Sequence, residues 1–137
     1  MDGEIQNVIR IAAALIDDES GRLMLVRKAG TPSFMQAGGK IEANEDPQEA
    51  LRRELLEEIG LDLSDHECRY LGCFSAPAAN ETDRFVEAQL FHVRTEHEPS
   101  IASEIEEAIW VHPAEAVKLI LAPLTRDCVL PLAAGLR

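Results

Sequence analysis

Residues 38–61, GGKIEANEDPQEALRRELLEEIGL, constrain the fold more than any other segment of the sequence. Asp46 is a typical N-cap residue, Pro47 suits the first helical position, and Glu49 follows the cap by three residues, as in a capping box. A glycine, suited to ending a helix in the left-handed conformation, closes the pattern. These signals predict a helix over residues 47–59.

The predicted helix carries an apolar stripe and an acidic face side by side. The stripe consists of Leu51, Leu55 and Ile59. Glu54, Glu57 and Glu58 share an arc of about 100° beside it, so we expect them at the edge of a cleft. Like charges four residues apart cost about 0.2–0.5 kcal/mol, and we expect Arg53 to offset part of this by pairing with Glu49.

Clustered carboxylates are also the ligands that hard cations such as Mg²⁺ and Mn²⁺ prefer, together with water and substrate phosphates. The net charge of −12 makes this chemistry relevant, because so acidic a chain repels free nucleotides. It also repels nucleic acid polymers and anionic membranes. A polyphosphate substrate would therefore need a bound cation as mediator.

The remaining composition predicts a cytoplasmic protein. No apolar run reaches the roughly 20 residues that span a bilayer, and the N-terminus lacks the pattern of a signal peptide. Cys68, Cys73 and Cys128 are irregularly spaced, which favours buried, reduced thiols over a disulfide framework or a metal site.

The length of 137 residues fits one domain, 1–137, in which strand and helix signals alternate. Strands are predicted over residues 7–16, 22–27, 34–38, 67–75, 84–95 and 105–111. Helices are predicted over 47–59, 114–121 and, interrupted by a proline, 125–134. Pro77 and Asn80 are expected in the loop before residue 84. The assembly expected is a mixed sheet with helices packed on it, in the α/β class.

The opening segment resembles the signature of the Nudix hydrolase family, G-x5-E-x7-R-E-U-x-E-E-x-G-U, in which U is aliphatic. The matching residues are Gly39, Glu45, Arg53, Glu54, Leu55, Glu57, Glu58, Gly60 and Leu61. The resemblance implies a Nudix-type α/β/α sandwich with a mixed β-sheet. It also implies a hydrolase that cleaves a nucleoside diphosphate linked to another moiety, with Mg²⁺ or Mn²⁺ as cofactor.

The resemblance further implies roles for the acidic residues. Glu54, Glu57 and Glu58 are expected to bind the metal together with the backbone carbonyl of Gly38. Among them we favour Glu54 as the catalytic base, with Glu57 as the next choice. A further ligand is expected from a loop outside the signature, where Glu104 is our candidate. Its rivals are Glu98, Glu106 and Glu107.

Arg53 is expected to orient the catalytic glutamates through salt bridges, including one with Glu45. Gly39 and Gly60 are expected at the turns that bracket the loop and helix, where a side chain would obstruct the backbone.

Basic and aromatic residues near the signature are candidates for substrate binding. Arg27, with its neighbour Lys28, and Lys40 can meet phosphate, although a solvated surface role is equally open for each. A nucleobase can stack on an aromatic ring, for which the sequence offers Phe34, Phe74 and Phe85.

Two other functions were weighed against the enzyme. A non-catalytic, nucleotide-binding regulator of the Nudix fold usually shows a damaged signature, whereas Glu54, Glu57 and Glu58 are all present. A simple cation-binding acidic protein leaves Arg53 and the bracketing glycines unexplained. The resemblance leaves the substrate open. In the Nudix family a proline at the distance of Pro77, 16 residues past Leu61, marks ADP-ribose hydrolases, whereas the short chain resembles the nucleoside triphosphate hydrolases. A homodimer is also left open.

Overall fold

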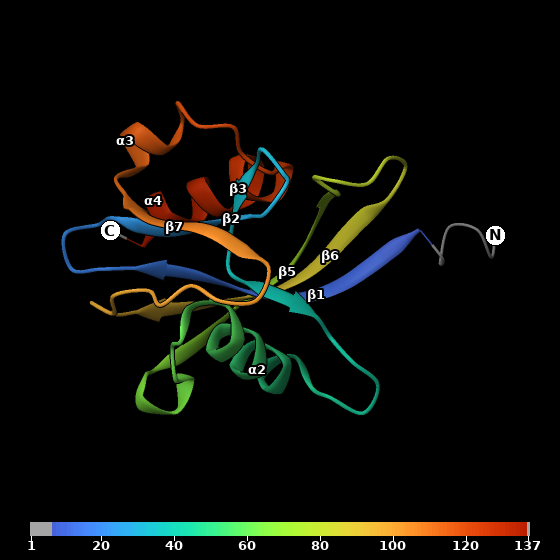
Figure 1. The fold of residues 1–137 in the computed structure, drawn as a ribbon, viewed down its shortest axis with the longest axis horizontal. Coiled ribbons are helices and arrows are strands. Elements are labelled where there is room, and N and C mark those ends of the chain that lie inside the picture. The colour runs from blue at the N-terminus through green and yellow to red at the C-terminus, as the bar shows by residue number, and fades with distance from the viewer. Residues whose placement is uncertain (1–6, 137) are drawn as a thin grey trace.

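The computed structural model describes residues 7–136, in which a mixed sheet lies between helices (Figure 1). The strands are β1 (Val8–Asp17), β2 (Leu23–Lys28), β3 (Phe34–Met35), β4 (Gly38–Lys40), β5 (Cys68–Pro77), β6 (Phe85–Arg94) and β7 (Ile105–Val111). The helices are α2 (Pro47–Ile59), the short 3₁₀ turn η1 (Leu63–Asp65), α3 (Pro113–Ala116), the π-helical turn η2 (Thr125–Val129) and α4 (Leu130–Gly135).

The described strands form one seven-stranded sheet in the order β3-β2-β1-β6-β5, with β4 beside β1 and β7 beside β2. Strands β1 and β6 run parallel along their whole length, from Val8 opposite Phe85 to Asp17 opposite Arg94. The other pairs are antiparallel. The mixed sheet of the predicted α/β architecture is therefore confirmed.

Successive residues of β1 point to opposite faces of the sheet and enter two separate cores. Ala12, Ala14 and Ile16 pack on the face covered by α2, whose buried Leu51, Leu55 and Ile59 form the predicted stripe. Ala13 and Leu15 pack on the other face, against residues of η2 and α4. Figure 1 shows α2 on one side of the sheet and α3 and α4 on the other, which is the expected sandwich.

Helix α2 has the predicted bounds and the predicted capping box. Asp46 accepts a hydrogen bond from the backbone N–H of Glu49, and the Glu49 side chain accepts one from the N–H of Asp46. Gly60 closes the helix with φ 71°, in the left-handed region that favours glycine.

Two predictions about the second half of the chain are wrong. Pro77 is the last residue of β5 and does not lie in the following loop. Helix α3 ends at Ala116, well short of the predicted residue 121. Residues 120–122 bond to β3 instead, since Phe34 N–H donates to the Ile120 carbonyl and Ala122 N–H donates to the Phe34 carbonyl. That pairing competes with helix continuation.

The predicted helix over 125–134 exists as η2 followed directly by α4. Pro131 lies in the first turn of α4, directly after the π-helical turn η2. The three cysteines are free. Cys73 is exposed, and Cys68 and Cys128 are only partly buried, so the expectation of three buried thiols is wrong. No helix within residues 7–136 is long and apolar enough to cross a membrane.

Candidate active site

The carboxylates of α2 lie directly against the glycines of β4. Gly38 N–H donates a 3.0 Å hydrogen bond to Oε1 of Glu58. A Cβ atom added to Gly39 would stand 2.3 Å from the carboxyl carbon of Glu54, far inside van der Waals contact. The Gly-Gly pair therefore lets a helix present two carboxylates to a strand at a distance that no side chain would allow.

Arg53 holds the acidic cluster together from one side. Its guanidinium lies 2.9 Å from Glu45 and 2.6 Å from Glu54, and it also donates to the carbonyl of Lys40 at 3.0 Å. The predicted ion pair with Glu45 is confirmed, and hydrogen bonds from Arg53 hold the pKa of Glu45 at about 2. The expected pairing of Arg53 with Glu49 is not made, because Glu49 caps α2 instead.

Glu58 is the most deeply buried of the three glutamates, with 4% of its surface exposed. Burial raises its pKa to about 7, although the hydrogen bond from Gly38 N–H opposes the shift. The negative charges of Glu54 and Glu104 raise the pKa further, and the Lys28 ammonium lowers it. Burial also raises the pKa of Glu54, against the effect of Arg53. Glu57 is exposed at the helix surface.

The loop that follows β6 is attached to the C-terminal end of α2 and brings Glu104 toward the cluster. Ser100 N–H donates to the Ile59 carbonyl, and Ala102 N–H donates to the Glu58 carbonyl. Glu104 thus lies near enough to influence Glu58, as expected of our candidate from outside the signature. Of its rivals, Glu106 and Glu107 pair with Arg27, and Glu98 lies in the same loop and is exposed, as Glu104 is.

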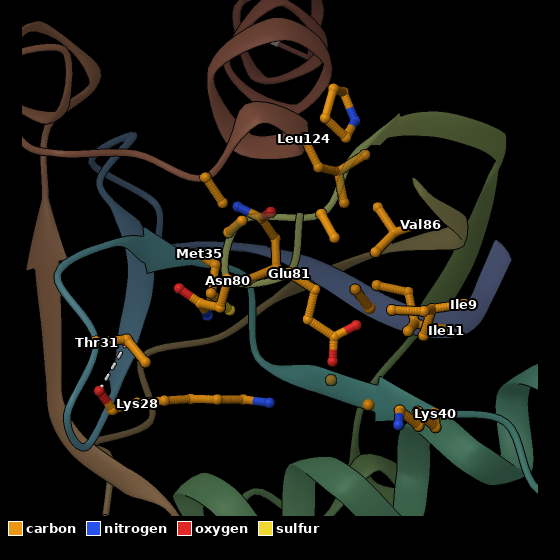
Figure 2. A pocket seen from close by; sticks show the side chains of 18 residues that line it. Ile9, Ile11, Lys28, Thr31, Met35, Lys40, Asn80, Glu81, Val86 and Leu124 are labelled. Atoms are coloured by element: carbon orange, nitrogen blue, oxygen red, sulfur yellow. Dashed lines mark hydrogen bonds between the residues drawn. The ribbon is translucent and has the colours of Figure 1, made fainter. Parts of the chain in front are cut away.

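A cavity of about 340 Å³ opens above β4 (Figure 2). Gly38, Gly39 and Lys40 line it on the side of α2, and the Lys28 side chain extends along the same side. Its apolar walls include Ile9, Ile11, Met35, Val86 and Leu124. Asn80 and Glu81 reach it from the loop between β5 and β6. The size suits part of a nucleotide.

The candidates for substrate binding differ in whether they line the cavity. Lys40 and Lys28 line it, whereas the Arg27 guanidinium is engaged by Glu106, by Glu107 and by the Thr31 carbonyl. None of the three candidate aromatic residues belongs to the described lining. Phe34 is buried in a core cluster, Phe74 packs against the α4 core and Phe85 is exposed on β6.

Sequence reasoning missed most of the cavity, because residues from β1, β6 and the segment after α3 meet there only through the sheet order. In the sequence, the residues that form the cavity walls look like ordinary strand positions. One signal was available: Gln36 stands between the apolar residues Met35 and Ala37 in a predicted strand, where an amide is unusual.

The acidic residues fit a divalent cation by their chemistry. Their side chains do not converge on one point, since within residues 7–136 no three acidic, histidine or cysteine groups are arranged to hold a metal. They supply only oxygen donors, as Mg²⁺ and Mn²⁺ prefer. Glu58 is moreover a buried carboxylate for which the described residues provide no cationic side chain at ion-pair distance.

Comparison with known proteins identifies the family of the chain. The family model of the NUDIX domain matches residues 8–132. A CTP pyrophosphohydrolase of Escherichia coli (strain K12) is 32% identical over 123 residues, covering 85% of this chain and 84% of that protein. The chain therefore belongs to the Nudix hydrolase family.

Solved structures share the fold. The E. coli dihydroneopterin triphosphate pyrophosphohydrolase superposes with a TM-score of 0.78 at 14% identity, over 92% of this chain and 95% of the other. The NUDIX domain of Shewanella oneidensis NrtR, in complex with ADP ribose, gives a TM-score of 0.76 at 13% identity, over 94% and 88%. At such identities the likeness concerns the fold alone.

Proposed function

We propose that this protein hydrolyses a nucleoside triphosphate to a nucleoside monophosphate and pyrophosphate, with Mg²⁺ or Mn²⁺ bound by the glutamates of α2. The observation that carries the proposal is the contact between the α2 carboxylates and the Gly38-Gly39 strand, which is also one wall of the cavity. A nucleotide in the cavity would have its phosphates beside oxygen ligands and beside Lys28 and Lys40.

The metal would be held by Glu54, Glu57, Glu58 and the Gly38 carbonyl, with Glu104 as a further ligand. When bound, it would neutralise phosphate charge and lower the pKa of coordinated water. Glu54 would accept the proton of the attacking water, a role that its partly desolvated carboxylate suits.

Arg53 would hold Glu54 in place through their ion pair, so that the carboxylate is preoriented before substrate arrives. Lys28 and Lys40 would attract and orient the phosphate chain electrostatically. Glycine at position 39 would keep the space that the Glu54 carboxylate occupies.

The choice of a nucleoside triphosphate is supported by the relative whose name gives CTP as the substrate and which matches most of the chain. ADP-ribose is the second candidate, and Pro77 supports it by lining the cavity. A regulator that binds nucleotide without turnover is the alternative from another class, and the NrtR domain of similar fold was solved with ADP ribose bound. The complete set of glutamates and the ion pairs of Arg53 with Glu45 and Glu54 favour an enzyme.

A substrate panel tests the proposal. Nucleoside triphosphates, 8-oxo-dGTP, ADP-ribose, dinucleoside polyphosphates and sugar nucleotides would each be incubated with Mg²⁺, with Mn²⁺ and with EDTA, and the products separated by anion exchange. We expect a triphosphate to be the best substrate, with monophosphate and pyrophosphate as products. Preference for ADP-ribose would change the substrate, and binding without turnover on the whole panel would overturn the hydrolase.

A further inference from the structure

The described lining of the cavity contains one acidic side chain, that of Glu81. Glu81 is exposed and belongs to the loop between β5 and β6. Figure 2 shows its side chain extending into the cavity, with the carboxylate pointing away from Leu124 and toward the strand that carries Lys40. The carboxylate therefore faces the stretch of the cavity between the apolar wall at Leu124 and the side of α2.

An ion pair holds the Glu81 carboxylate from outside the described lining. Nη1 of Arg84 lies 3.3 Å from Oε2 of Glu81. The backbone closes the loop at the same place, because Ala78 N–H donates a 2.9 Å hydrogen bond to the Arg84 carbonyl. Each oxygen of a carboxylate has two lone pairs, so Glu81 can accept hydrogen bonds from a ligand while it stays paired with Arg84.

The chemistry of a carboxylate limits what Glu81 can contact in a nucleotide. An ionised carboxylate accepts hydrogen bonds but donates none, and it repels phosphate. With the phosphates beside Lys28 and Lys40 and the base against the apolar wall at Leu124, the sugar would occupy the stretch that Glu81 faces. The hydroxyls of ribose are donors at this place, and acidic residues accept from ribose hydroxyls in dinucleotide-binding folds.

We propose that Glu81 selects ribonucleotides by accepting hydrogen bonds from the 2′- and 3′-hydroxyls of the sugar. This inference rests on the proposed function, because it places the nucleotide in the same cavity. A 2′-deoxyribonucleotide lacks one of the two donors, and a 2′,3′-dideoxyribonucleotide lacks both. Hydrogen bonds to a charged acceptor are stronger than those between neutral groups, so each missing hydroxyl should weaken binding.

The test compares kcat and KM for CTP, 2′-deoxy-CTP and 2′,3′-dideoxy-CTP, which share the base and the triphosphate. Glu81→Ala removes the acceptor from an exposed loop position, so we expect the variant to fold, and its unfolding temperature checks this. Glu87→Ala is the matched control. The Glu87 side chain is 38% exposed, against 44% for Glu81, and pairs with Arg10 outside the described lining.

We expect wild type to favour CTP over 2′-deoxy-CTP by about tenfold in kcat/KM, and 2′-deoxy-CTP over the dideoxy nucleotide by a smaller factor. In Glu81→Ala the KM of CTP should rise to that of the dideoxy nucleotide with kcat little changed, so that the three substrates become equivalent. Glu87→Ala should keep the wild-type ranking. A wild type without preference for CTP, or an equal loss on all three nucleotides in Glu81→Ala, would overturn the inference.

Failure of the proposed function gives a different result. If wild type hydrolyses none of the three triphosphates, calorimetric binding of CMP, 2′-deoxy-CMP and 2′,3′-dideoxy-CMP to the same proteins takes the place of kinetics. A preference for CMP that Glu81→Ala abolishes would still support the role of Glu81. Equal binding of the three monophosphates to wild type would refute it.

Discussion

The 2.6 Å contact between Arg53 and Glu54 concerns two residues that are adjacent in the chain. Arg53 reaches Glu45 at the same time, so the loop before α2 and the helix itself are joined through one guanidinium. Planar, multiply bonded guanidinium groups restrict a carboxylate more than a single ammonium does. At the scale of single residues, these ion pairs of Arg53 set the geometry of Glu54, the proposed base.

Replacing Glu54 with glutamine should lower kcat by roughly 10²–10⁴ and change KM much less, because the amide keeps the shape but cannot take a proton. The deficit should persist at every metal concentration. Steady-state kinetics across a Mg²⁺ titration measures both parameters. A kcat within tenfold of wild type would exclude Glu54 as the base and direct attention to Glu57.

Arg53→Ala should behave differently in kind. Without the ion pair to Arg53, the Glu54 carboxylate is mispositioned and its negative charge is less well compensated. The rate and the metal requirement should therefore change together. We expect excess Mg²⁺ to restore part of the activity. The same titration measures this, and Arg52→Ala, which removes an exposed neighbouring arginine, is the matched control. A deficit independent of metal would argue against a positioning role.

Glu58→Gln should raise the melting temperature in EDTA at pH 8 and reduce the gain on adding Mg²⁺. At that pH the buried Glu58 is charged, and the neutral amide avoids its desolvation while still accepting from Gly38 N–H. Thermal unfolding with and without Mg²⁺ checks both parts. In EDTA, Glu57→Gln is the control for an exposed glutamate. If Mg²⁺ stabilises Glu58→Gln as much as it stabilises wild type, Glu58 is not a ligand.

At the scale of elements, the two glycines of β4, Gly38 and Gly39, leave no room for a side chain, but for two different reasons. A Cβ at Gly38 would lie 2.2 Å from the Ala12 carbonyl oxygen of β1, and φ there is 151°. The three atoms nearest to a Cβ at Gly39 would all belong to the carboxylate of Glu54. The first conflict involves backbone, which cannot move without breaking the sheet, and the second involves the end of a side chain.

Alanine substitutions should therefore separate stability from catalysis. Gly38→Ala should destabilise the fold by several kcal/mol, roughly the range of overpacked and strained sites, and reduce soluble protein. Gly39→Ala should unfold at nearly the wild-type temperature but lose most activity, because Glu54 is displaced from Arg53. Unfolding curves and kcat measured on both variants test this. An active Gly39→Ala enzyme would contradict the proposed placement of Glu54.

The helices and strands differ in how far they could be predicted from the sequence. Helix α2 was predictable to the residue because its cap, stripe and closing glycine are all local signals. The residues of the acidic cluster followed from helical spacing and from the family signature. Helix α3 was overpredicted because pairing of residues 120–122 with β3 is a long-range effect. The cavity was not predictable, since the parallel β1–β6 pairing brings its walls together over more than 70 residues of sequence.

For the whole molecule, buried acidic residues tie distant strands together at the end of β1. Asp17 is 2% exposed and bonds to His92 and Arg94 of β6. Asp18 is 1% exposed, and although burial alone would raise its pKa, hydrogen bonds from Arg22 and Ser20 lower the pKa from 3.8 to about 2. Asp17 and Asp18 stabilise the folded state only when their carboxylates are charged.

Stability should therefore fall in acid. Because the pKa of Asp18 is lower in the folded state, the unfolded state binds the proton first, and the contribution is lost as pH falls from about 4 toward 2. Asp18→Asn should cost about 1–3 kcal/mol at pH 6 and less at pH 3. Urea unfolding at both values checks this. Asp127→Asn, at an exposed pair with Arg126, should change little at either pH.

The most direct test of the central claim is hydrolysis by protein freed of metal. Wild type would be dialysed against EDTA, transferred to metal-free buffer and supplied with CTP, and its products followed by ³¹P NMR while Mg²⁺ is titrated in. We predict no turnover before Mg²⁺ is added, followed by release of CMP and pyrophosphate as Mg²⁺ rises, with Glu57→Gln requiring more Mg²⁺ than wild type. Undiminished turnover in the metal-free protein would contradict it.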